Sequence, residues 1–457
     1  MIEELNRRDF LKKGSAFASG TFLMGGVPTH VLAADPGEPA RPRSANDQIQ
    51  LALIGAGTRG QPDARVALQV PGVKLVAAAD VFDSRLTHCH EVWGSGIFTT
   101  RDYGEILSRS DVDAVLIAAP DHWHKQAAVD AMNAGKDVYL EKPMIHAYSD
   151  GPEIIETARR TGRILQVGSQ RVSSILYKKA QQLVQAGSLG RLTVINAWWD
   201  RNINSPVLAF NASISPDASP QTVDWPRFLG TAPKVPFSAE RLFQWKKFSE
   251  YGSGVAGDLF VHLFSGTHFI TGSNGPVRAF ATGGIRYWKD GRDEPDVLLG
   301  LFDYAAEGFN LHLRVNFVQG APENEGFFFA GSEGTLQIRG DSVILTRLVR
   351  DPDPDYDIAS FSEATQKQFM AEFRAKYPVT HPSGDPAAAD ERYVAPEGYN
   401  DVYDHFKNFF EAVRARRPVV EDPLFGYRAA GAALLANLSY QQRRVVQWDP
   451  VTPALVS

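Results

Sequence analysis

The chain contains a single cysteine, Cys89, among 457 residues. An intrachain disulfide and a cysteine-based zinc site are therefore both excluded, and we interpret Cys89 as a packing residue. Long runs of lysine or arginine are absent and the formal charge is −6, which argues against nucleic acid as a main partner. The sequence also offers no stable membrane span. With 44 % hydrophobic and 22 % charged residues, it has the composition of a globular protein large enough for two domains.

The N-terminus has the layout of a secretory leader. Asn6-Arg7-Arg8-Asp9-Phe10-Leu11-Lys12 places two arginines before an uncharged stretch at 14–27, and Val31-Leu32-Ala33 offers small residues for cleavage. The arginine pair is typical of the twin-arginine route, which exports folded proteins. We therefore predict a signal peptide at 1–34, a proline-containing linker at 35–47 and a periplasmic location. A basic amphipathic start of a cytosolic enzyme is the alternative.

A glycine-rich turn follows the first predicted strand. Residues 49–54 are apolar and lead into Gly55-Ala56-Gly57-Thr58-Arg59-Gly60, after which 63–69 is compatible with a helix. In this context G-x-G-x-x-G is typical of dinucleotide binding, because the glycines permit a tight turn and a close approach of backbone N–H groups to a pyrophosphate. A glycine-rich turn in an unrelated α/β domain is the alternative. The predicted cofactor contacts in this turn are Gly55, Gly57, Thr58, Arg59 and Gly60.

Asp80 ends the second predicted strand, 73–79, twenty residues after Gly60. A carboxylate at this position can accept hydrogen bonds from the adenosine ribose and would repel a 2′-phosphate. NAD is therefore favoured over NADP, although Arg85 lies close enough in sequence to weaken that preference.

Strands and helices keep alternating as far as residue 170, with strands expected at 113–119, 137–140 and 163–167 and helices at 125–133 and 151–161. This alternation predicts a doubly wound parallel sheet, and we assign 48–170 to an NAD-binding Rossmann domain. Ligands of such sheets bind at the carboxyl ends of the strands. The residues just after strand ends are therefore candidates for the site: Pro120, His124, Glu141, Lys142 and Gln170. His122 and His124 lack a third ligand, so no metal site is predicted.

The second half of the chain has a different pattern, with short strands and hairpin connections. The expected strands are 192–200, 277–287, 297–304, 309–317, 326–330 and 335–338. They predict a large, mainly antiparallel sheet in an α+β domain at 171–457. Residues 351–400 are expected to form a surface excursion with one short helical piece. Helices at 399–416 and 422–440 are expected to pack back toward the Rossmann domain.

Several motifs together resemble the glucose–fructose oxidoreductase/inositol dehydrogenase family (Gfo/Idh/MocA). They are Glu141-Lys142-Pro143 after a strand, the turn Pro120-Asp121-His122-Trp123-His124, Gly135-Lys136-Asp137-Val138, and Asp258-Leu259-Phe260-Val261-His262 in the second half. The resemblance covers nearly the whole chain after the leader. It implies that Lys142, Asp258 and His262 line a catalytic pocket, and that a homodimer or homotetramer forms through the C-terminal sheet.

The spacing of Asp258 and His262 adds a chemical expectation. A helix over 257–270 would place them at i and i+4 on one face, so that the carboxylate reaches the imidazole and raises its basicity. His262 would then be the general base, and Lys142 would stabilise the alkoxide or relay the proton.

These observations predict a periplasmic NAD(P)-dependent oxidoreductase that transfers a hydride between a secondary alcohol of a sugar or polyol and the nicotinamide. Trp199, Arg201 and Tyr287 near strand ends are the expected substrate contacts, with sheet packing as the alternative for each. Two other functions stay open. One is an NAD-dependent glycoside hydrolase or lyase that acts through a transient keto-sugar with no net redox change. The other is a non-catalytic ligand-binding protein.

Overall fold

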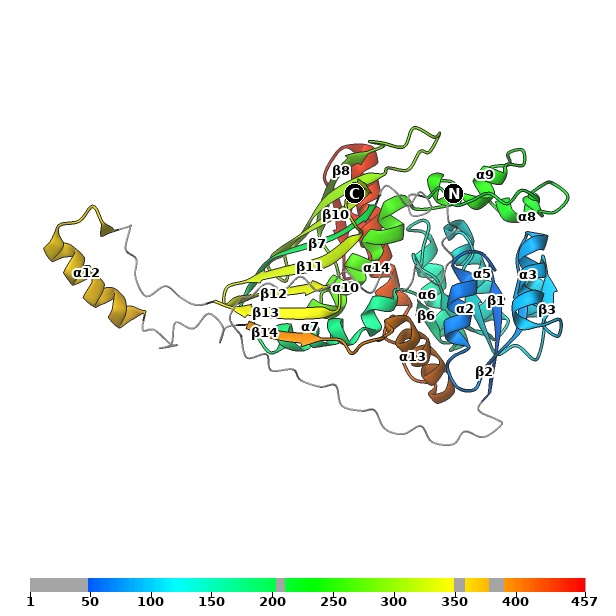
Figure 1. The fold of residues 1–457 in the computed structure, drawn as a ribbon, viewed down its shortest axis with the longest axis horizontal. Coiled ribbons are helices and arrows are strands. Elements are labelled where there is room, and N and C mark those ends of the chain that lie inside the picture. Colours follow the sequence, from blue (N-terminus) through cyan, green and yellow to red (C-terminus); the bar gives the residue numbers. More distant parts are fainter. Residues whose placement is uncertain (1–47, 203–209, 349–357, 378–389, 457) are drawn as a thin grey trace, which may run out of the picture.

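The structure, a computed structural model, describes residues 48–202, 210–348, 358–377 and 390–456 (Figure 1). The predicted leader at 1–34 and linker at 35–47 lie outside the described residues. Two sheets organise the chain, one in each half. No helix in the described ranges is both long and apolar enough to cross a membrane.

The N-terminal sheet has six strands, all parallel, in the order β3-β2-β1-β4-β5-β6. Its central strands are buried on both faces, which explains why the sequence shows continuous apolar runs there. The predicted doubly wound parallel sheet is confirmed. The strands are β1 (Ile49–Ile54), β2 (Val73–Ala79), β3 (Phe98–Thr100), β4 (Ala114–Ile117), β5 (Asp137–Leu140) and β6 (Leu165–Val167), and the helices are α2 (Gly60–Ala67), α3 (Asp83–Trp93), α4 (Tyr103–Leu107), α5 (His124–Asn133) and α6 (Asp150–Thr161).

The C-terminal sheet has ten strands in the order β14-β13-β12-β11-β7-β10-β9-β8-β15-β16, and every pair except β7–β10 is antiparallel. The predicted mainly antiparallel sheet is confirmed. The strands are β7 (Leu192–Asn202), β8 (Arg278–Gly284), β9 (Val297–Tyr304), β10 (Phe309–Gln319), β11 (Asn324–Gly331), β12 (Gly334–Arg339), β13 (Ser342–Arg347), β14 (Asp390–Val394), β15 (Val446–Asp449) and β16 (Ala454–Val456).

Three helices lie along one face of this sheet: α7 (Ile175–Gln185), α10 (Val261–Thr271) and α14 (Pro423–Gln442) (Figure 1). The helix α13 (Asp401–Ala415) instead packs against the Rossmann domain, where Phe406 stacks on Tyr139 with ring centroids 4.3 Å apart. The excursion between β13 and β14 carries α12 (Glu363–Lys376), none of whose residues is buried.

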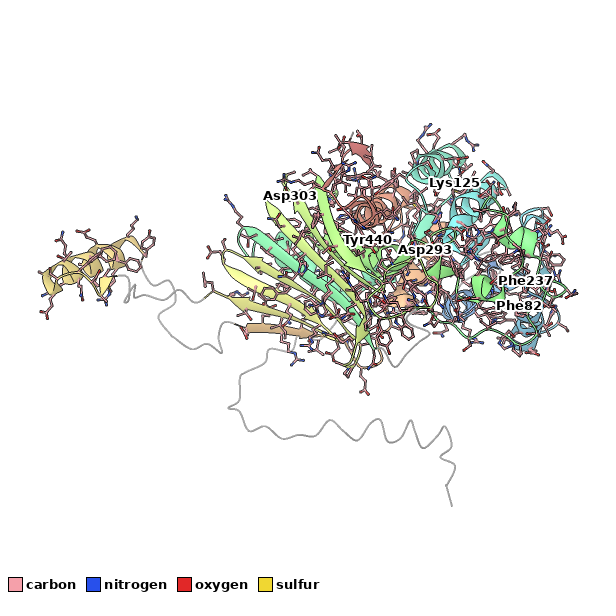
Figure 2. The ribbon with its side chains drawn as sticks, turned by 90° about the horizontal axis from the view of Figure 1, so that it is seen from above. Phe82, Lys125, Phe237, Asp293, Asp303 and Tyr440 are labelled. Carbon is pink, nitrogen blue, oxygen red and sulfur yellow. The ribbon has the colours of Figure 1, made fainter. Side chains whose placement is uncertain are left out.

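A long connection between β7 and α10 reaches back over the Rossmann domain. We call residues 210–252 the covering segment; it contains α8 (Trp225–Leu229) and α9 (Ala239–Phe243). Val223 forms an isolated antiparallel bridge with Phe82, the residue before α3, and the Asp224 N–H donates to the Val81 carbonyl at 2.8 Å. A separate apolar cluster joins Phe82 to side chains of the covering segment, and Phe82 and Phe237 lie close together in Figure 2. The sequence patterns did not predict this packing.

Candidate active site

The glycine turn lies between β1 and α2. A Cβ added to Gly55, whose φ is +92°, would come within 2.7 Å of the Ala118 backbone, and one on Gly60 would overlap the Gly55 carbonyl oxygen. At Gly57 the nearest atom to an added Cβ belongs to the Arg85 guanidinium, at 3.5 Å. Close packing therefore requires glycine at positions 55 and 60. At Gly57 the absence of a side chain instead leaves space over the turn.

The backbone N–H groups around Gly57 are also available to bind a ligand. Within the described chain, the N–H groups of Gly57, Thr58 and Arg59 donate to no protein acceptor. Free N–H groups that precede the first turn of a helix form a site for an anion such as a pyrophosphate. The turn therefore fits the phosphates of a dinucleotide.

A cavity of about 260 Å³ adjoins the turn. One wall comes from the Rossmann domain and includes Asp80, Arg85 and Pro120, and the other includes Phe228, Leu242 and Trp245 of the covering segment. The Asp80 carboxylate accepts the N–H groups of Ala56 at 2.8 Å and Phe82 at 3.0 Å, while Arg85 lies 3.4 Å away. Asp80 is thus fixed where the sequence predicts the ribose acceptor.

A second cavity, of about 380 Å³, shares Arg59, Trp245 and Lys246 with the first, so the two adjoin. It brings together most of the predicted site residues from both halves of the chain: Arg59, His124, Glu141, Lys142, Gln170, Trp199, Arg201, Asp258 and His262.

Tyr287 does not line either of these cavities. The strand expected over 277–287 ends at Gly284, and the backbone N–H of Tyr287 donates to Asp296 at 2.8 Å. The Tyr287 side chain is 53 % exposed. The turn after β8 therefore carries it away from the other predicted substrate contacts.

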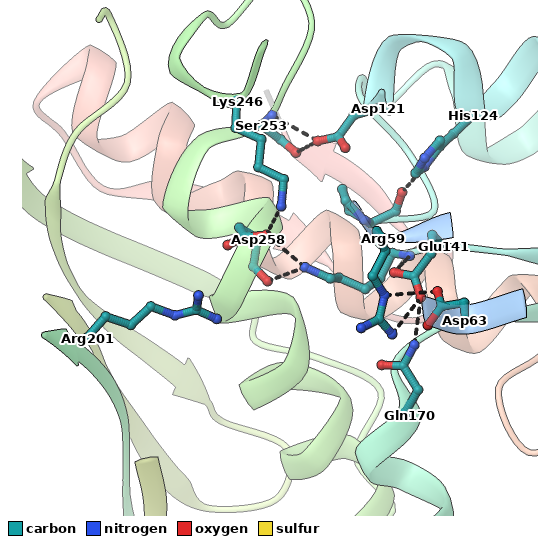
Figure 3. Close-up of polar contacts among 12 residues, drawn as sticks. Arg59, Asp63, Asp121, His124, Glu141, Gln170, Arg201, Lys246, Ser253 and Asp258 are labelled. Carbon is teal, nitrogen blue, oxygen red and sulfur yellow. Dashed lines mark hydrogen bonds and ion pairs between the residues drawn. The ribbon is translucent and has the colours of Figure 1, made fainter. Parts of the chain in front are cut away.

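Lys142 and Lys246 share the Asp258 carboxylate (Figure 3). Lys142 Nζ donates to Asp258 Oδ1 at 2.9 Å and to the Asp258 carbonyl at 2.6 Å, and Lys246 Nζ donates to the same Oδ1 at 2.6 Å. Burial alone would raise the pKa of Asp258, but the two ammonium charges hold it well below its usual range. Burial lowers the pKa of Lys142; the Lys246 charge lowers it further, while Asp258 opposes both.

The predicted hydrogen bond between Asp258 and His262 is wrong. Residues Ala256–Phe260 form a π-helical turn, which changes the angular relation between positions 258 and 262, and the lysines bind the carboxylate. His262 Nδ1 is buried and has no partner in the described ranges. Burial, together with the charges of Lys142 and Arg171, holds the pKa of His262 well below its usual range, so its imidazole is neutral.

Glu141 holds the backbone of the site in place. Its Oε1 accepts from Arg59 at 3.1 Å and from Gln170 at 2.6 Å, and its Oε2 accepts the Lys142 N–H at 3.2 Å. Arg59 also pairs with the buried Asp63 at 2.9 Å. Burial and the nearby Glu141 raise the pKa of Asp63, so this carboxyl retains a proton more readily than an exposed one.

His124, the first residue of α5, also holds the backbone next to Lys142 in place. Its two ring nitrogens lie 2.9 Å from the Ala119 carbonyl and 2.7 Å from the Pro143 carbonyl. The ring therefore ties the β4 turn to the residue that follows Lys142. His124, Glu141 and Gln170 act on Lys142 and the cavity wall through these hydrogen bonds.

Sequence reasoning missed several charged residues of the second cavity or its walls: Asp63, Arg171, Lys246 and Asp401. Asp63 could have been found, because it lies in the first helical turn after the glycine motif. Lys246 gave no signal, because only the tertiary path of the covering segment brings it to Asp258.

The fold and these cavities define a two-domain protein built on a dinucleotide-binding domain. Residues 49–169 match the family described as "Oxidoreductase family, NAD-binding Rossmann fold" (GFO_IDH_MocA). The N-terminal domain therefore matches the NAD-binding Rossmann domain of this oxidoreductase family, and the resemblance suggested by the sequence motifs is supported over residues 49–169.

Two curated relatives illustrate the similarity. The chain is 27 % identical over 229 residues to the scyllo-inositol 2-dehydrogenase (NAD(+)) of Bacillus subtilis, a match that covers 46 % of this chain and 66 % of that protein. It is 30 % identical over 173 residues to a glycosyl hydrolase family 109 protein of Shewanella pealeana, covering 35 % and 38 %. The chain thus matches less than two thirds of the length of either protein.

The fold similarity extends further than the sequence similarity. The structure of scyllo-inositol dehydrogenase from Lactobacillus casei with bound cofactor NAD(H) and scyllo-inositol aligns with a TM-score of 0.60 at 18 % identity. That alignment covers 88 % of this chain and 99 % of the other. Both domains of this chain therefore share the architecture of that protein.

Proposed function

We propose that the protein is an NAD-dependent oxidoreductase acting on a secondary alcohol of a sugar or polyol. The observation that carries the proposal is the arrangement of Lys142 and His262 on one cavity that adjoins the glycine turn. Bound NAD supplies the hydride acceptor for alcohol oxidation. The matches to an inositol dehydrogenase in sequence and in fold support this class of substrate.

In this proposal Lys142 receives the hydroxyl proton. Its side chain is 11 % exposed, its ammonium is oriented by Asp258, and its lowered pKa makes the neutral amine accessible nearer to neutral pH. His262 lacks the carboxylate partner that a strong base needs, so its neutral ring is assigned to a hydrogen bond with the reacting hydroxyl. Trp199 and Arg201 form the wall that holds the rest of the substrate.

The direct test is to add a panel of sugars and polyols with NAD to the purified protein and to measure reduced nicotinamide. Turnover that depends on Lys142 supports the proposal. Nicotinamide reduction that is equally fast in a Lys142→Met variant contradicts it.

A second candidate is glycoside cleavage through a transient keto-sugar, with the hydride returned to the sugar. The covering segment favours it, because a cofactor enclosed between that segment and the Rossmann domain is suited to internal recycling. A glycosyl hydrolase family 109 protein is among the relatives. Release of nitrophenol from nitrophenyl glycosides without added NAD and without net reduction would support this candidate over the dehydrogenase.

We propose that the protein is exported in the folded state to the periplasm. The support is the Arg7-Arg8 pair before an uncharged stretch in the sequence. Fractionation of cells that express the chain, with an Arg7→Lys/Arg8→Lys variant as control, tests the proposal. Export that does not depend on the arginine pair contradicts it.

We also propose that two copies associate through the open face of the ten-stranded sheet. Phe280 and Leu301 are directly opposite each other on β8 and β9 and are 42 % and 58 % exposed. Neighbouring exposed apolar side chains on a sheet face that no described helix covers support an interface there.

A further inference from the structure

Among the residues that the structure describes, five cationic side chains line the second cavity: Arg59, Lys142, Arg171, Arg201 and Lys246. Arg201 differs from the other four. The other four donate hydrogen bonds to carboxylates of the protein. Arg201 donates no hydrogen bond within the described residues, and its Nε is buried without a hydrogen-bond partner. Within the described residues its one ion pair is with Glu323, whose Oε1 lies 3.5 Å from Nε, and its charge also acts on Asp258 and Glu325.

Glu323 is only a partial partner for Arg201. Its Oε1 already accepts the indole N–H of Trp199 at 2.8 Å, and its side chain is 42 % exposed to solvent. The Arg201 side chain is much less exposed, at 16 %. A guanidinium with so little access to water needs acceptors for its N–H groups, because an unsatisfied buried donor is costly.

Packing fixes the direction of this guanidinium. Arg201 and Trp199 are two residues apart on β7, so their side chains lie on the same face of the strand. The Arg201 guanidinium lies 5.7 Å from the Trp199 ring and 5.8 Å from the Phe317 ring. Figure 3 shows it turned toward Asp258 across the cavity. Asp258 is already bound by Lys142 and Lys246, so it does not satisfy the guanidinium.

Neither nearby carboxylate is available to Arg201 alone. Asp258 is shared by Lys142 and Lys246, and Glu323 also accepts the indole N–H of Trp199. An anionic substituent on the bound molecule would supply the missing hydrogen-bond acceptors together with a negative charge. Arginine presents a planar fork of donors that matches two oxygens of a carboxylate or phosphate.

We propose that the substrate is an anionic monosaccharide, whose carboxylate or phosphate is bound by Arg201 while its reacting hydroxyl lies at Lys142. This inference rests on the proposed function and narrows its substrate class. Arg201 is a specificity-determining residue in this assignment and takes no part in proton or hydride transfer.

The test compares matched charged and neutral sugars on the NAD-loaded, full-length protein. The probes are glucuronate, galacturonate and glucose 6-phosphate against glucose and galactose. Because hydrogen bonds to a charged group are lost, Arg201→Gln should raise KM for the charged sugar about 10–100-fold with little change in kcat. Arg201→Lys should recover part of the loss, and the rise in KM for neutral sugars should be much smaller than the rise for charged ones.

The control variant is Arg314→Gln. Arg314 pairs with Asp200 on the other face of the same sheet, so its loss should leave every KM unchanged. A lower KM for the uronates than for the sugar phosphate would identify a carboxylate as the anion, and the reverse would identify a phosphate.

Binding measured by calorimetry separates this inference from the proposed function. If charged sugars bind through Arg201 but no nicotinamide is reduced, the oxidoreductase proposal fails and the anion site stands. If neutral sugars are oxidised as efficiently as charged ones, and Arg201→Gln affects both alike, the anion site is overturned while the oxidoreductase stands. If no probe binds, the anion site is likewise overturned.

Discussion

At the residue scale, the chemistry of the site depends on how three charges share a buried space. Asp258 accepts from Lys142 and Lys246, and the nearby Lys246 charge lowers the pKa of Lys142. The carboxylate orients Lys142 and at the same time raises its pKa, while burial and Lys246 lower it. The pKa of Lys142 therefore depends on both of these neighbouring side chains.

Replacing Lys142 by Met should abolish proton acceptance without emptying the cofactor site. We expect kcat/KM to fall by roughly 10²–10⁴-fold, which is the usual contribution of a positioned acid–base group. Lys179→Met is the matched control, since Lys179 pairs with Glu391 away from both cavities. Steady-state kinetics together with an NAD binding titration measure both effects, and a loss of NAD binding in Lys142→Met would argue against this role.

The pH dependence of alcohol oxidation should shift in opposite directions in two variants. Oxidation needs the neutral amine, so the rate rises as pH increases through the pKa of Lys142. Lys246→Met removes a charge that lowers this pKa, so the acidic limb should move to higher pH. Asp258→Asn removes a charge that raises it, so the limb should move to lower pH. Shifts in the same direction, measured on kcat/KM, would show that Lys142 is not the titrating group.

The positions of Lys142, Asp258 and His262 could be predicted from motifs, but their partners could not. The i, i+4 spacing of Asp258 and His262 implies contact only in an α-helix, and the local turn is π-helical. Lys246 belongs to a segment whose path depends on contacts with distant parts of the chain. Local sequence therefore identifies the functional groups, whereas tertiary packing decides which of them interact.

At the scale of elements, the glycine turn and the covering segment enclose the cofactor cavity from two sides. The turn comes from the first βα unit of the Rossmann domain, and the covering segment comes from the chain between β7 and α10. Each half of the enclosure can be perturbed separately.

Gly57→Ala should weaken NAD binding while the fold stays intact. An added Cβ meets only the Arg85 guanidinium, at 3.5 Å, but it would occupy the approach of the pyrophosphate to the free N–H groups. We expect about a tenfold or larger rise in the Kd for NAD, or about 1.4 kcal/mol. Gly96→Ala is the control, because its Cβ would have no neighbour within 4 Å. An unchanged Kd by calorimetry, with an unchanged Tm, would contradict the assignment of the turn.

Trp225→Ala should loosen the covering segment and speed NAD release. Trp225 stacks on Phe228 at 4.9 Å and donates to the Val235 carbonyl at 2.7 Å. Trp448→Ala removes another buried tryptophan, from β15 of the C-terminal sheet, so both variants should lose roughly 3–5 kcal/mol of stability. Stopped-flow displacement of NAD should show faster release only in Trp225→Ala. Equal release rates in the two variants would show that the segment does not retain the cofactor.

Strongly patterned elements could be predicted from the sequence, and weakly patterned ones could not. The strands at β1, β2, β5 and β9 have the predicted bounds, because each combines apolar residues with clear turn signals. The strand β14 was missed, because its sequence Asp390–Val394 is mostly charged and it pairs only at the sheet edge. The covering segment was missed because its helices α8 and α9 have only five residues each, too few to show a helical pattern.

At the scale of the whole molecule, the ten-stranded sheet has one face covered by helices and another that carries exposed apolar side chains. Phe280→Glu/Leu301→Glu should therefore convert the proposed oligomer into monomers, because each copy would bury two charges in the interface. Light scattering after size exclusion measures the mass, with Val451→Glu, 66 % exposed and outside the strands, as the control. A wild-type protein that is already monomeric would contradict the proposed interface.

The central claim is that the Rossmann cavity and the Lys142 cavity form one reaction centre. It is tested most directly by a single-turnover measurement of the near-ultraviolet absorbance of reduced nicotinamide after sugars are mixed with the NAD-loaded protein. We predict a rapid rise for the wild-type protein and a rise that is at least about a hundredfold slower for Lys142→Met. NAD that stays oxidised with every sugar and polyol in the wild-type protein, or is reduced at the same rate in both proteins, would contradict the claim.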